Sequence, residues 1–286
     1  MIKYFLLLFL IFLSACGEGY ARFQAQRDGV FGTTAVFMGY AQNERAFAQH
    51  AEYVFQRLDE LHRLFDMSAV NANAGIAPVA VPREVIDMLL AAREAYIMTD
   101  GKTNITLGPV LRIWHDYRAE GLTLPFMDNL YAAARYVDMS RLIIDETGGT
   151  VFLEDAGMSL DAGSVAKGFA AGLVMEETEL SAAVLNIGGH IVAKGTPPGR
   201  DFWNIAFQDD TVHFTDAALS VSGGETFGHI IDPDTLLPAM RFRQAAVIHP
   251  CSWTADALST ALFILSEEEG DAMAKRYGAV AFRLLH

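Results

Sequence analysis

Hydrophobic positions recur at helical spacing through the first half of the chain. In residues 43–67 (NERAFAQHAEYVFQRLDELHRLFDM) apolar side chains return every three or four positions, which predicts one long amphipathic helix. Similar spacing over 83–101, 108–121 and 127–137 predicts further helices. The segment 30–41 (VFGTTAVFMGYA) is instead rich in β-branched and aromatic residues and predicts a strand.

The pattern changes near residue 140, where short β-rich runs replace the helical spacing. We expect strands within the segments 141–155, 182–195, 202–210, 218–224, 229–232, 245–250 and 279–285. Helices interrupt these runs near Val165 and near Thr254. Helices early and strands late, with little βαβ alternation, predict an α+β fold in which a helical N-terminal half packs with a mostly antiparallel sheet. The connections are short, so we expect one domain over residues 28–286.

Composition narrows the classes of partner. The chain has 286 residues, of which 52% are hydrophobic, enough to bury a large core. Its formal net charge is −14, and it has no cluster of Lys and Arg. Proteins that bind nucleic acid usually present a basic face, so we expect no nucleic-acid partner. An anionic ligand would have to be held locally, by a metal, a helix N-terminus or a few placed cations.

The first residues are typical of an export signal. Lys3 precedes the apolar run 4–13, which is too short to span a membrane, and the motif LSAC then ends at Cys16. This motif resembles a bacterial lipobox. We therefore expect a signal peptide over 1–15, lipidation of Cys16, a tether over 16–27, and a protein anchored by lipid outside the cytoplasm, on the periplasmic side of a bacterial membrane. The alternative is an ordinary secretory signal in which the Cys occurs by chance.

A Lys stands among small residues at a predicted strand-to-helix junction. In the segment 160–172 (LDAGSVAKGFAAG), Gly163 and Ser164 would let the backbone turn tightly and point N–H groups outward, and Lys167 would lie in the first helical turn. A cation there is mildly unfavourable unless an anion is bound. The segment therefore indicates a phosphate site, although a surface Lys with its stem packed on apolar neighbours remains the alternative.

A second candidate site lies in the segment 253–265 (WTADALSTALFIL). Thr254 is a candidate N-cap, which would put Asp256 in the first helical turn. Thr260 is four residues later and shares a helix face with Asp256. A carboxylate and a hydroxyl are hard oxygen ligands suited to Mg²⁺. The alternative is a capping Asp and a Thr whose hydroxyl bonds to the carbonyl one turn back.

Two glycine-containing motifs predict turns at which a ligand could approach the backbone. Gly188-Gly189 lies between apolar runs and predicts a tight hairpin, which would also let a ligand approach the backbone; the adjacent His190 we interpret as structural. Ser222-Gly223 ends a predicted strand, and His229 is predicted to start a strand that stops at Asp232. His229 is a candidate acid or base, with a structurally satisfied His as the alternative.

Together and in this order, these segments resemble one family, the FAD:protein FMN transferases or ApbE family. The resemblance is carried by Leu160–Ala170, Leu185–His190, Val221–Gly223, His229–Pro238 and Ala255–Leu262. It implies Mg²⁺-dependent transfer of FMN from FAD to a Thr or Ser hydroxyl of an acceptor protein, with release of AMP. The implied acceptors are flavoprotein subunits of extracytoplasmic or membrane electron-transfer systems. The alternatives are a Mg²⁺-dependent FAD pyrophosphatase and a non-catalytic flavin-binding lipoprotein.

The resemblance also implies roles for individual residues. The metal would be held by Asp256, Thr260 and the carbonyl of Ser164. Lys167 would contact the FAD pyrophosphate and assist catalysis together with Asp256, and His229 would be the base for the acceptor hydroxyl. The other implied FAD contacts are Phe31, Lys102, Thr103, Asn104, Asp161, Gly188, Gly189, Ser222, Gly223 and Ile230.

The chain departs from the family pattern at several of these positions. Ser164 replaces a Gly or Ala, although a backbone carbonyl survives that change. Thr103-Asn104 replaces an aromatic-Asp pair, Phe31 replaces a Met, and Leu236-Leu237 replaces a Thr-Gly turn. Because the positions expected to bind Mg²⁺ and phosphate are intact, we expect activity with an altered flavin pocket.

Overall fold

The computed structural model describes residues 19–121, 124–208, 210–224 and 228–285, so the predicted signal peptide and Cys16 lie outside the described residues. The chain divides into two compact units. Within the described residues, the first unit is formed by 19–62, Lys167–Ser220 and Ile248–Ala255, and the second by Arg63–Ala166, Val221–Val247 and Asp256–His286 without the gaps and the last residue. Among these residues, every helix is too short or too polar to cross a bilayer.

An antiparallel sheet forms the framework of the first unit. Its strands follow the order β1 (Ala21–Val30), β2 (Thr33–Ala41), β6 (Ala183–Ile187), β7 (His190–Lys194) and β10 (Ala217–Gly223), and each pairs antiparallel with its neighbour. A separate hairpin joins β8 (Trp203–Phe207) and β9 (Asp210–Phe214). The mostly antiparallel sheet predicted from the alternating strands is therefore confirmed here.

The first strand was missed: the strand expected over 30–41 corresponds to β2, and a turn at Phe31-Gly32 separates it from β1. Residues 21–27, which we expected in a tether, form most of β1 and pair with β2 from Ala21 opposite Ala41. The polar residues of this segment did not indicate a strand. They are compatible with one because β1 is an edge strand of the sheet, where side chains can face solvent. Ala25 and Val30 are both buried although they are an odd number of positions apart, and the register shift between Asp28 and Val30 interrupts the strict alternation between them.

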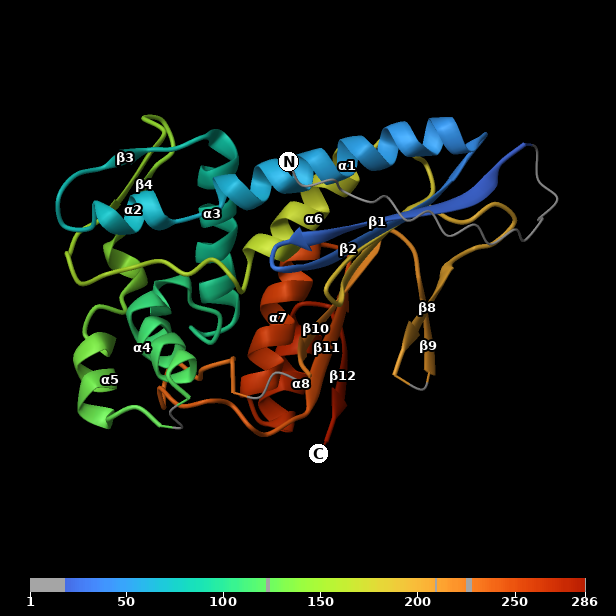
Figure 1. Cartoon of the computed structure of the whole chain (residues 1–286). Helices are drawn as coiled ribbons and strands as arrows, with labels where there is room; N and C mark the ends of the chain where they lie inside the picture. The colour runs from blue at the N-terminus through green and yellow to red at the C-terminus, as the bar shows by residue number, and fades with distance from the viewer. Residues whose placement is uncertain (1–18, 122–123, 209, 225–227, 286) are drawn as a thin grey trace. The chain divides into compact units, whose positions relative to one another are not determined.

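Helix α1 (Glu44–Leu64) covers one face of this sheet. Its buried residues Phe47, Ala51, Val54, Phe55, Leu58 and Leu61 form the stripe that the 3.6-residue period predicts. The Phe47 ring stacks against Phe23 of β1 and Phe37 of β2, with centroids 5.7 Å apart in both pairs. Figure 1 shows α1 in blue lying along these two strands. The stacked rings therefore contribute to the packing of the helix on the sheet.

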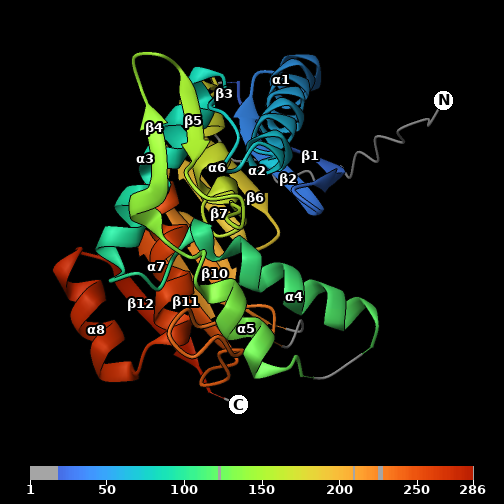
Figure 2. The same cartoon turned by 90° about the vertical axis from the view of Figure 1, so that its left-hand side faces the viewer.

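The second unit contains most of the helices. They are α2 (Ser68–Ala72), α3 (Arg83–Met98), α4 (Gly108–Ala119), α5 (Met127–Ala134) and α8 (Glu267–Arg276), together with short 3-10 turns at Ile105–Leu107 and Met139–Arg141. A small antiparallel sheet has the order β3 (Val79–Ala80), β5 (Thr150–Leu153) and β4 (Leu142–Asp145). Figure 2 shows the β4–β5 hairpin, and α4 beside α5. The last strands of this unit are β11 (Gln244–His249) and β12 (Val280–Leu284).

Helix α7 (Ser252–Ile264) begins with residues of the first unit and continues into the second. We expected it to begin at Thr254, which is wrong: Thr254 is the third helical residue, and Asp256 follows in the second turn. The N–H of Cys251, the residue directly before the helix, donates a hydrogen bond of 3.0 Å to the Nδ1 atom of His249, so a local turn precedes the helix start.

Two further expectations about secondary structure are wrong. Residues 229–232 form no strand, only a single bridge between Ile231 and Pro238, because the Asp232 side chain bonds to the backbone N–H of Asp234 and turns the chain. Helix α8 was missed, although Ser266 and Glu269 form a capping box at its start. That motif is the sequence signal that could have identified α8.

Candidate active site

The turn that follows α3 carries the first group of predicted site residues. Thr103 is 1% exposed, and its hydroxyl donates to the carbonyl of Ala257 in α7 over 2.8 Å. The neighbouring Asn104 caps the next 3-10 turn by accepting from the N–H and the hydroxyl of Thr106, at 2.9 and 2.7 Å. Both side chains therefore have structural partners, and Thr103 fixes this turn against the helix that carries Asp256.

The segment before α6 (Ala166–Glu177) lies beside the same turn. The N–H of Asp161 donates to the carbonyl of Ile105 over 2.8 Å. The side chain of Asn71 holds Leu160 from the other side, accepting from its N–H at 2.7 Å and donating to its carbonyl at 3.0 Å. These bonds keep the chain extended without a strand partner, so the strand that we expected here is replaced by a side-chain bracket. Asn71 was missed because an Asn in a turn-rich loop gives no sign of a partner 89 residues away.

Asp161 and the residues after it form a tight turn before the helix. The Asp161 carboxylate accepts from the N–H of Gly163 over 2.9 Å, so it shapes the turn that presents the Ser164 carbonyl. Helix α6 then begins at Ala166, which confirms that Lys167 lies in the first helical turn. Ala166 is the last residue of the second unit before the chain enters the first, where Lys167 belongs.

Helix α7 and the end of β10 bring three hydroxyl groups together. The Ser222 hydroxyl lies 2.8 Å from that of Ser259 and 3.3 Å from that of Thr260. The Thr260 hydroxyl also donates to the carbonyl of Asp256 at 3.2 Å. This is the structural role that the sequence left open as the alternative to metal binding. Asp256 itself is 5% exposed, so its carboxylate lies in a buried setting one turn before Thr260.

The close packing of β10 on α7 depends on a glycine. Gly223 has φ +94°, and a Cβ atom there would overlap the Phe263 ring and the carbonyl of Arg243. A side chain at this position would therefore push the strand end, and with it Ser222, away from Thr260. The sequence motif Ser222-Gly223 marks this close approach.

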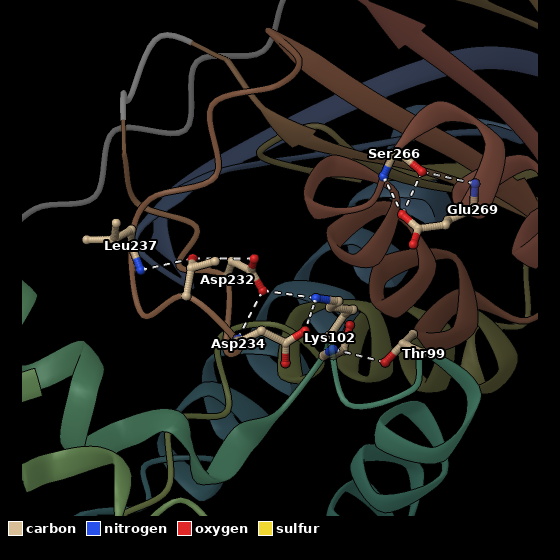
Figure 3. Close-up of polar contacts among 9 residues, drawn as sticks. Thr99, Lys102, Asp232, Asp234, Leu237, Ser266 and Glu269 are labelled. Carbon is tan, nitrogen blue, oxygen red and sulfur yellow. Dashed lines mark hydrogen bonds and ion pairs between the residues drawn. The ribbon is translucent and has the colours of Figure 1, made fainter. Parts of the chain in front are cut away.

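Lys102 joins the same turn to the loop after β10. Its ammonium donates to Asp232 at 3.1 Å and to Asp234 at 2.6 Å. We refer to residues 229–239 as the 229–239 loop; it carries His229 and Ile230. Figure 3 shows Lys102 pointing toward both carboxylates. The sequence did not identify Asp232 and Asp234 as partners, although the motif IIDPDT placed two carboxylates in one turn.

The remaining predicted residues belong to the first unit. The Phe31 ring stacks on His62 with centroids 4.9 Å apart. Gly188 and Gly189 have φ values of +55° and +92° and form the two-residue turn between β6 and β7, so the predicted hairpin is confirmed. The adjacent His190 is 1% exposed, and its Nε2 atom lies 2.8 Å from the Ser252 hydroxyl, as a structural His requires.

The residues of the second unit fit a magnesium ion in the chemistry of their donors. Asp256 supplies one carboxylate, Thr260 and Ser222 supply hydroxyls, and Ser164 supplies a carbonyl, which are all hard oxygens. Among the described residues, no group of three or more His, Cys, Asp or Glu could hold a metal. This donor set is consistent with Mg²⁺, which usually takes one or two carboxylates and completes its shell with water and phosphate oxygens.

The contacts within the second unit therefore connect segments that are far apart in the sequence. One series of hydrogen bonds joins Asp161 to Ile105, Thr103 to Ala257, and Lys102 to Asp232, and Ser222 meets Thr260 of the same α7. The predicted contacts of Lys167, Phe31, Gly188 and Gly189 with this group stay predictions. No sequence period could have found the bonds in this series, because each joins residues that are distant along the chain.

Comparisons with known proteins identify the family of this chain. The sequence model of the ApbE family matches residues 31–284. An FAD:protein FMN transferase of Treponema pallidum is 29% identical over 310 residues, covering 93% of this chain and 85% of that protein. One of Klebsiella pneumoniae is 27% identical over 279 residues, covering 85% of each.

Solved structures have the same fold. The apo form of the Pseudomonas stutzeri flavinyl transferase ApbE aligns with a TM-score of 0.82 at 25% identity and covers 96% of this chain and 95% of that one. The Thermotoga maritima ApbE protein aligns with a TM-score of 0.81 at 22% identity, covering 92% and 94%. The predicted α+β fold is therefore confirmed, and because the family match spans nearly the whole described chain, the chain belongs to the ApbE family.

Proposed function

We propose that this protein transfers FMN from FAD to a Thr or Ser hydroxyl of an acceptor protein, releases AMP, and requires Mg²⁺ to do so. The observation that carries the proposal is the hydrogen-bonded connection, within the second unit, of the segments around Lys102, Asp161, Ser222 and Asp256. The relatives from T. pallidum and K. pneumoniae are named for this activity.

The oxygen donors on α7 are the proposed metal ligands. Asp256, Thr260 and the Ser164 carbonyl would hold Mg²⁺, which would stabilise the negative charge that develops on phosphate oxygens. The hydrogen bond from Thr260 to the Asp256 carbonyl orients the hydroxyl on the helix before any ion binds. A buried carboxylate gains more from a bound cation than an exposed one, because less water screens the pair.

Binding of FAD is proposed to use backbone as much as side chains. Lys167, three residues after Ser164 in the chain, would pair with the pyrophosphate, and Asp161 would line the same region through the turn it shapes. The turn 102–104, Phe31, Gly188-Gly189, Ser222-Gly223 and Ile230 would contact the rest of the dinucleotide. Thr103, Asn104 and Ser222 already have protein partners for their side chains, which favours contacts through their backbone.

The proposed reaction is a displacement at the phosphorus atom of the FMN half. The acceptor hydroxyl oxygen forms the new P–O bond, the P–O bond to AMP breaks, and the hydroxyl proton passes to His229 as base. The nucleophile comes from the acceptor, so no Ser or Cys of this chain has to form a covalent intermediate. Stabilising the transferred phosphoryl oxygens is therefore the main task of the residues around α7.

We also propose that the protein is a lipoprotein outside the cytoplasm. The LSAC motif supports cleavage before Cys16 and lipidation of that residue. The acceptors would then be flavoprotein subunits of extracytoplasmic or membrane electron-transfer systems. Metabolic labelling with a fatty acid, compared between the native sequence and Cys16→Ala, tests the anchor; labelling that persists in the variant would contradict it.

The activity is tested by incubating the purified protein with FAD, Mg²⁺ and a domain that accepts FMN. We expect covalent flavin fluorescence on the acceptor after denaturing electrophoresis, and its loss when EDTA replaces Mg²⁺. An acceptor variant with Val in place of the modified Thr is the matched control. AMP release at a rate that the acceptor does not increase would instead indicate FAD hydrolysis.

A further inference from the structure

Lys102 is held between two carboxylates rather than left to face solvent. Its ammonium lies 3.1 Å from Asp232 and 2.6 Å from Asp234, and the side chain is 14% exposed. Asp232 is similarly covered, at 18%, whereas Asp234 is 75% exposed. The pair with Asp232 is therefore the shielded one, where water screens the attraction least.

Asp232 organises the loop that it belongs to. Its carboxylate accepts from the N–H of Asp234 at 3.1 Å, and its carbonyl accepts from the N–H of Leu236 at 2.8 Å. The N–H of Asp232 donates to the Leu237 carbonyl at 2.9 Å, and the N–H of Ala239 donates to the Ile230 carbonyl at 2.9 Å. The 229–239 loop is thus closed on itself by its own hydrogen bonds.

A hydrophobic cluster anchors the loop to the rest of the second unit at one point. Leu236 and Ile231 are buried in the cluster formed with Leu107, Val110, Trp114 and Leu130, and the indole N–H of Trp114 donates to the Leu236 carbonyl at 2.9 Å. A piece held only there could still rotate about that contact. The Lys102–Asp232 pair supplies the second point, three residues after His229 and two after Ile230.

The charge on Lys102 is maintained at neutral pH. Burial alone would lower the pKa of its ammonium, but the hydrogen bonds to Asp234 and Asp232 outweigh burial and raise this pKa above its ordinary value. Replacing the Lys by a neutral side chain would leave the covered Asp232 carboxylate without its cation. Removing one partner of such a pair destabilises a protein more than replacing both partners by neutral side chains.

We propose that Lys102 is a positioning residue, whose ammonium holds Asp232 and thereby fixes the 229–239 loop, with His229 and Ile230, in the orientation needed for transfer. This inference rests on the proposed function and assigns the Lys102 side chain to the protein, while the backbone of the turn remains available to FAD. Because the ammonium acts through Asp232, its loss should slow the chemical step, in which His229 is the base, more than it weakens FAD binding through Ile230.

The test compares Lys102→Met, Lys102→Arg and Asp232→Asn, with Lys275→Met as the matched control at an exposed Lys of α8. We expect Lys102→Met and Asp232→Asn each to lower kcat about 10- to 100-fold, since small misplacements of reacting groups have effects of this size. The KM for FAD should change less than about threefold, because binding is little affected. Lys102→Arg should retain most of kcat, and the double variant Lys102→Met/Asp232→Asn should be no slower than either single variant.

A second readout does not depend on activity. Hydrogen exchange at the amides of Asp232, Leu236 and Ala239 should become faster in Lys102→Met, while amides of α3 and α7 keep their protection. Unchanged exchange in the loop would overturn the inference, and so would a raised KM for FAD in Lys102→Met with normal kinetics in Asp232→Asn. If the native protein transfers no FMN, the proposed function fails, and the exchange data alone still decide whether Lys102 holds the loop.

Discussion

At the residue scale, Thr260 beside Asp256 shows that a hydroxyl can have a structural hydrogen bond and still belong to a proposed metal site. Thr260 uses its hydroxyl to bond the Asp256 carbonyl and also lies 3.3 Å from the Ser222 hydroxyl. The sequence predicted the helix face shared by Asp256 and Thr260 and left the carbonyl bond open as an alternative, but it did not place Ser222 beside Thr260. Ser222 is 38 residues away from Thr260, and only the fold brings it to α7.

Asp256→Asn tests the proposed metal ligand. The amide keeps the shape of the side chain but removes the negative charge, so we expect the fold to persist and FMN transfer to fall at least about 100-fold. Loss of a group that merely orients a metal ligand has effects of about 10- to 100-fold, and the ligand itself should matter at least as much. Transfer rates measured across a Mg²⁺ titration, with Asp271→Asn as control, give the comparison. Normal transfer at low Mg²⁺ in Asp256→Asn would contradict the assignment.

Leu236 combines a left-handed backbone conformation with burial, which the sequence did not predict. It has φ +62°, a conformation that favours glycine, and it is nevertheless buried in the cluster with Trp114. The left-handed backbone destabilises a non-glycine residue by about 1–2 kcal/mol, and burial of the side chain offsets this. No propensity predicts the combination, because it depends on packing against α4.

Two variants of Leu236 separate these effects. Leu236→Ala loses the buried side chain and keeps the strained backbone, so we expect the free energy of unfolding to fall by about 2–5 kcal/mol. Leu236→Gly loses the same packing but relieves the strain, and should be about 1 kcal/mol more stable than Leu236→Ala. Urea denaturation measures the difference. A glycine variant less stable than the alanine variant would show that the backbone at Leu236 is not strained.

At the scale of elements, periodicity predicted the long helices well and the short elements poorly. The stripe of α1 depends on residues three and four apart, so the sequence contains all the information needed. The 229–232 segment instead satisfies its backbone through the Asp232 side chain, a local competition that the alternation of apolar residues does not reveal. The start of α7 at Ser252 likewise follows a local turn, in which Cys251 bonds to His249, that periodicity does not reveal.

The capping box of α8 carries a prediction about pH. Hydrogen bonds from the Ser266 hydroxyl and N–H lower the pKa of Glu269, so its carboxylate stabilises the helix above its ordinary pKa. This contribution is lost as the pH falls through the lowered pKa. Ser266→Ala should lower the free energy of unfolding by about 1 kcal/mol at pH 7, and the difference from the native protein should shrink under acidic conditions. Urea titrations at both pH values provide the measurement, and a difference that grows on acidification would contradict the assigned sign.

At the scale of the whole molecule, the order of the motifs predicted the family and the fold class, while most contacts that build the site were not predictable. The ion pair between Lys102 and Asp232 spans 130 residues, and the bond from Thr103 to Ala257 spans 154. Both depend on the path of the chain through the second unit. The residues that a motif marks were therefore easier to identify than the residues that hold them.

The single most direct test is intact-mass spectrometry of an acceptor domain incubated with the protein, FAD and Mg²⁺, with AMP quantified in the same sample. We predict that the acceptor gains one FMN as a phosphoester on its Thr, that one AMP appears for each FMN transferred, and that EDTA abolishes both. An acceptor of unchanged mass, whether AMP is absent or is released together with free FMN, would contradict FMN transfer as the activity of this protein.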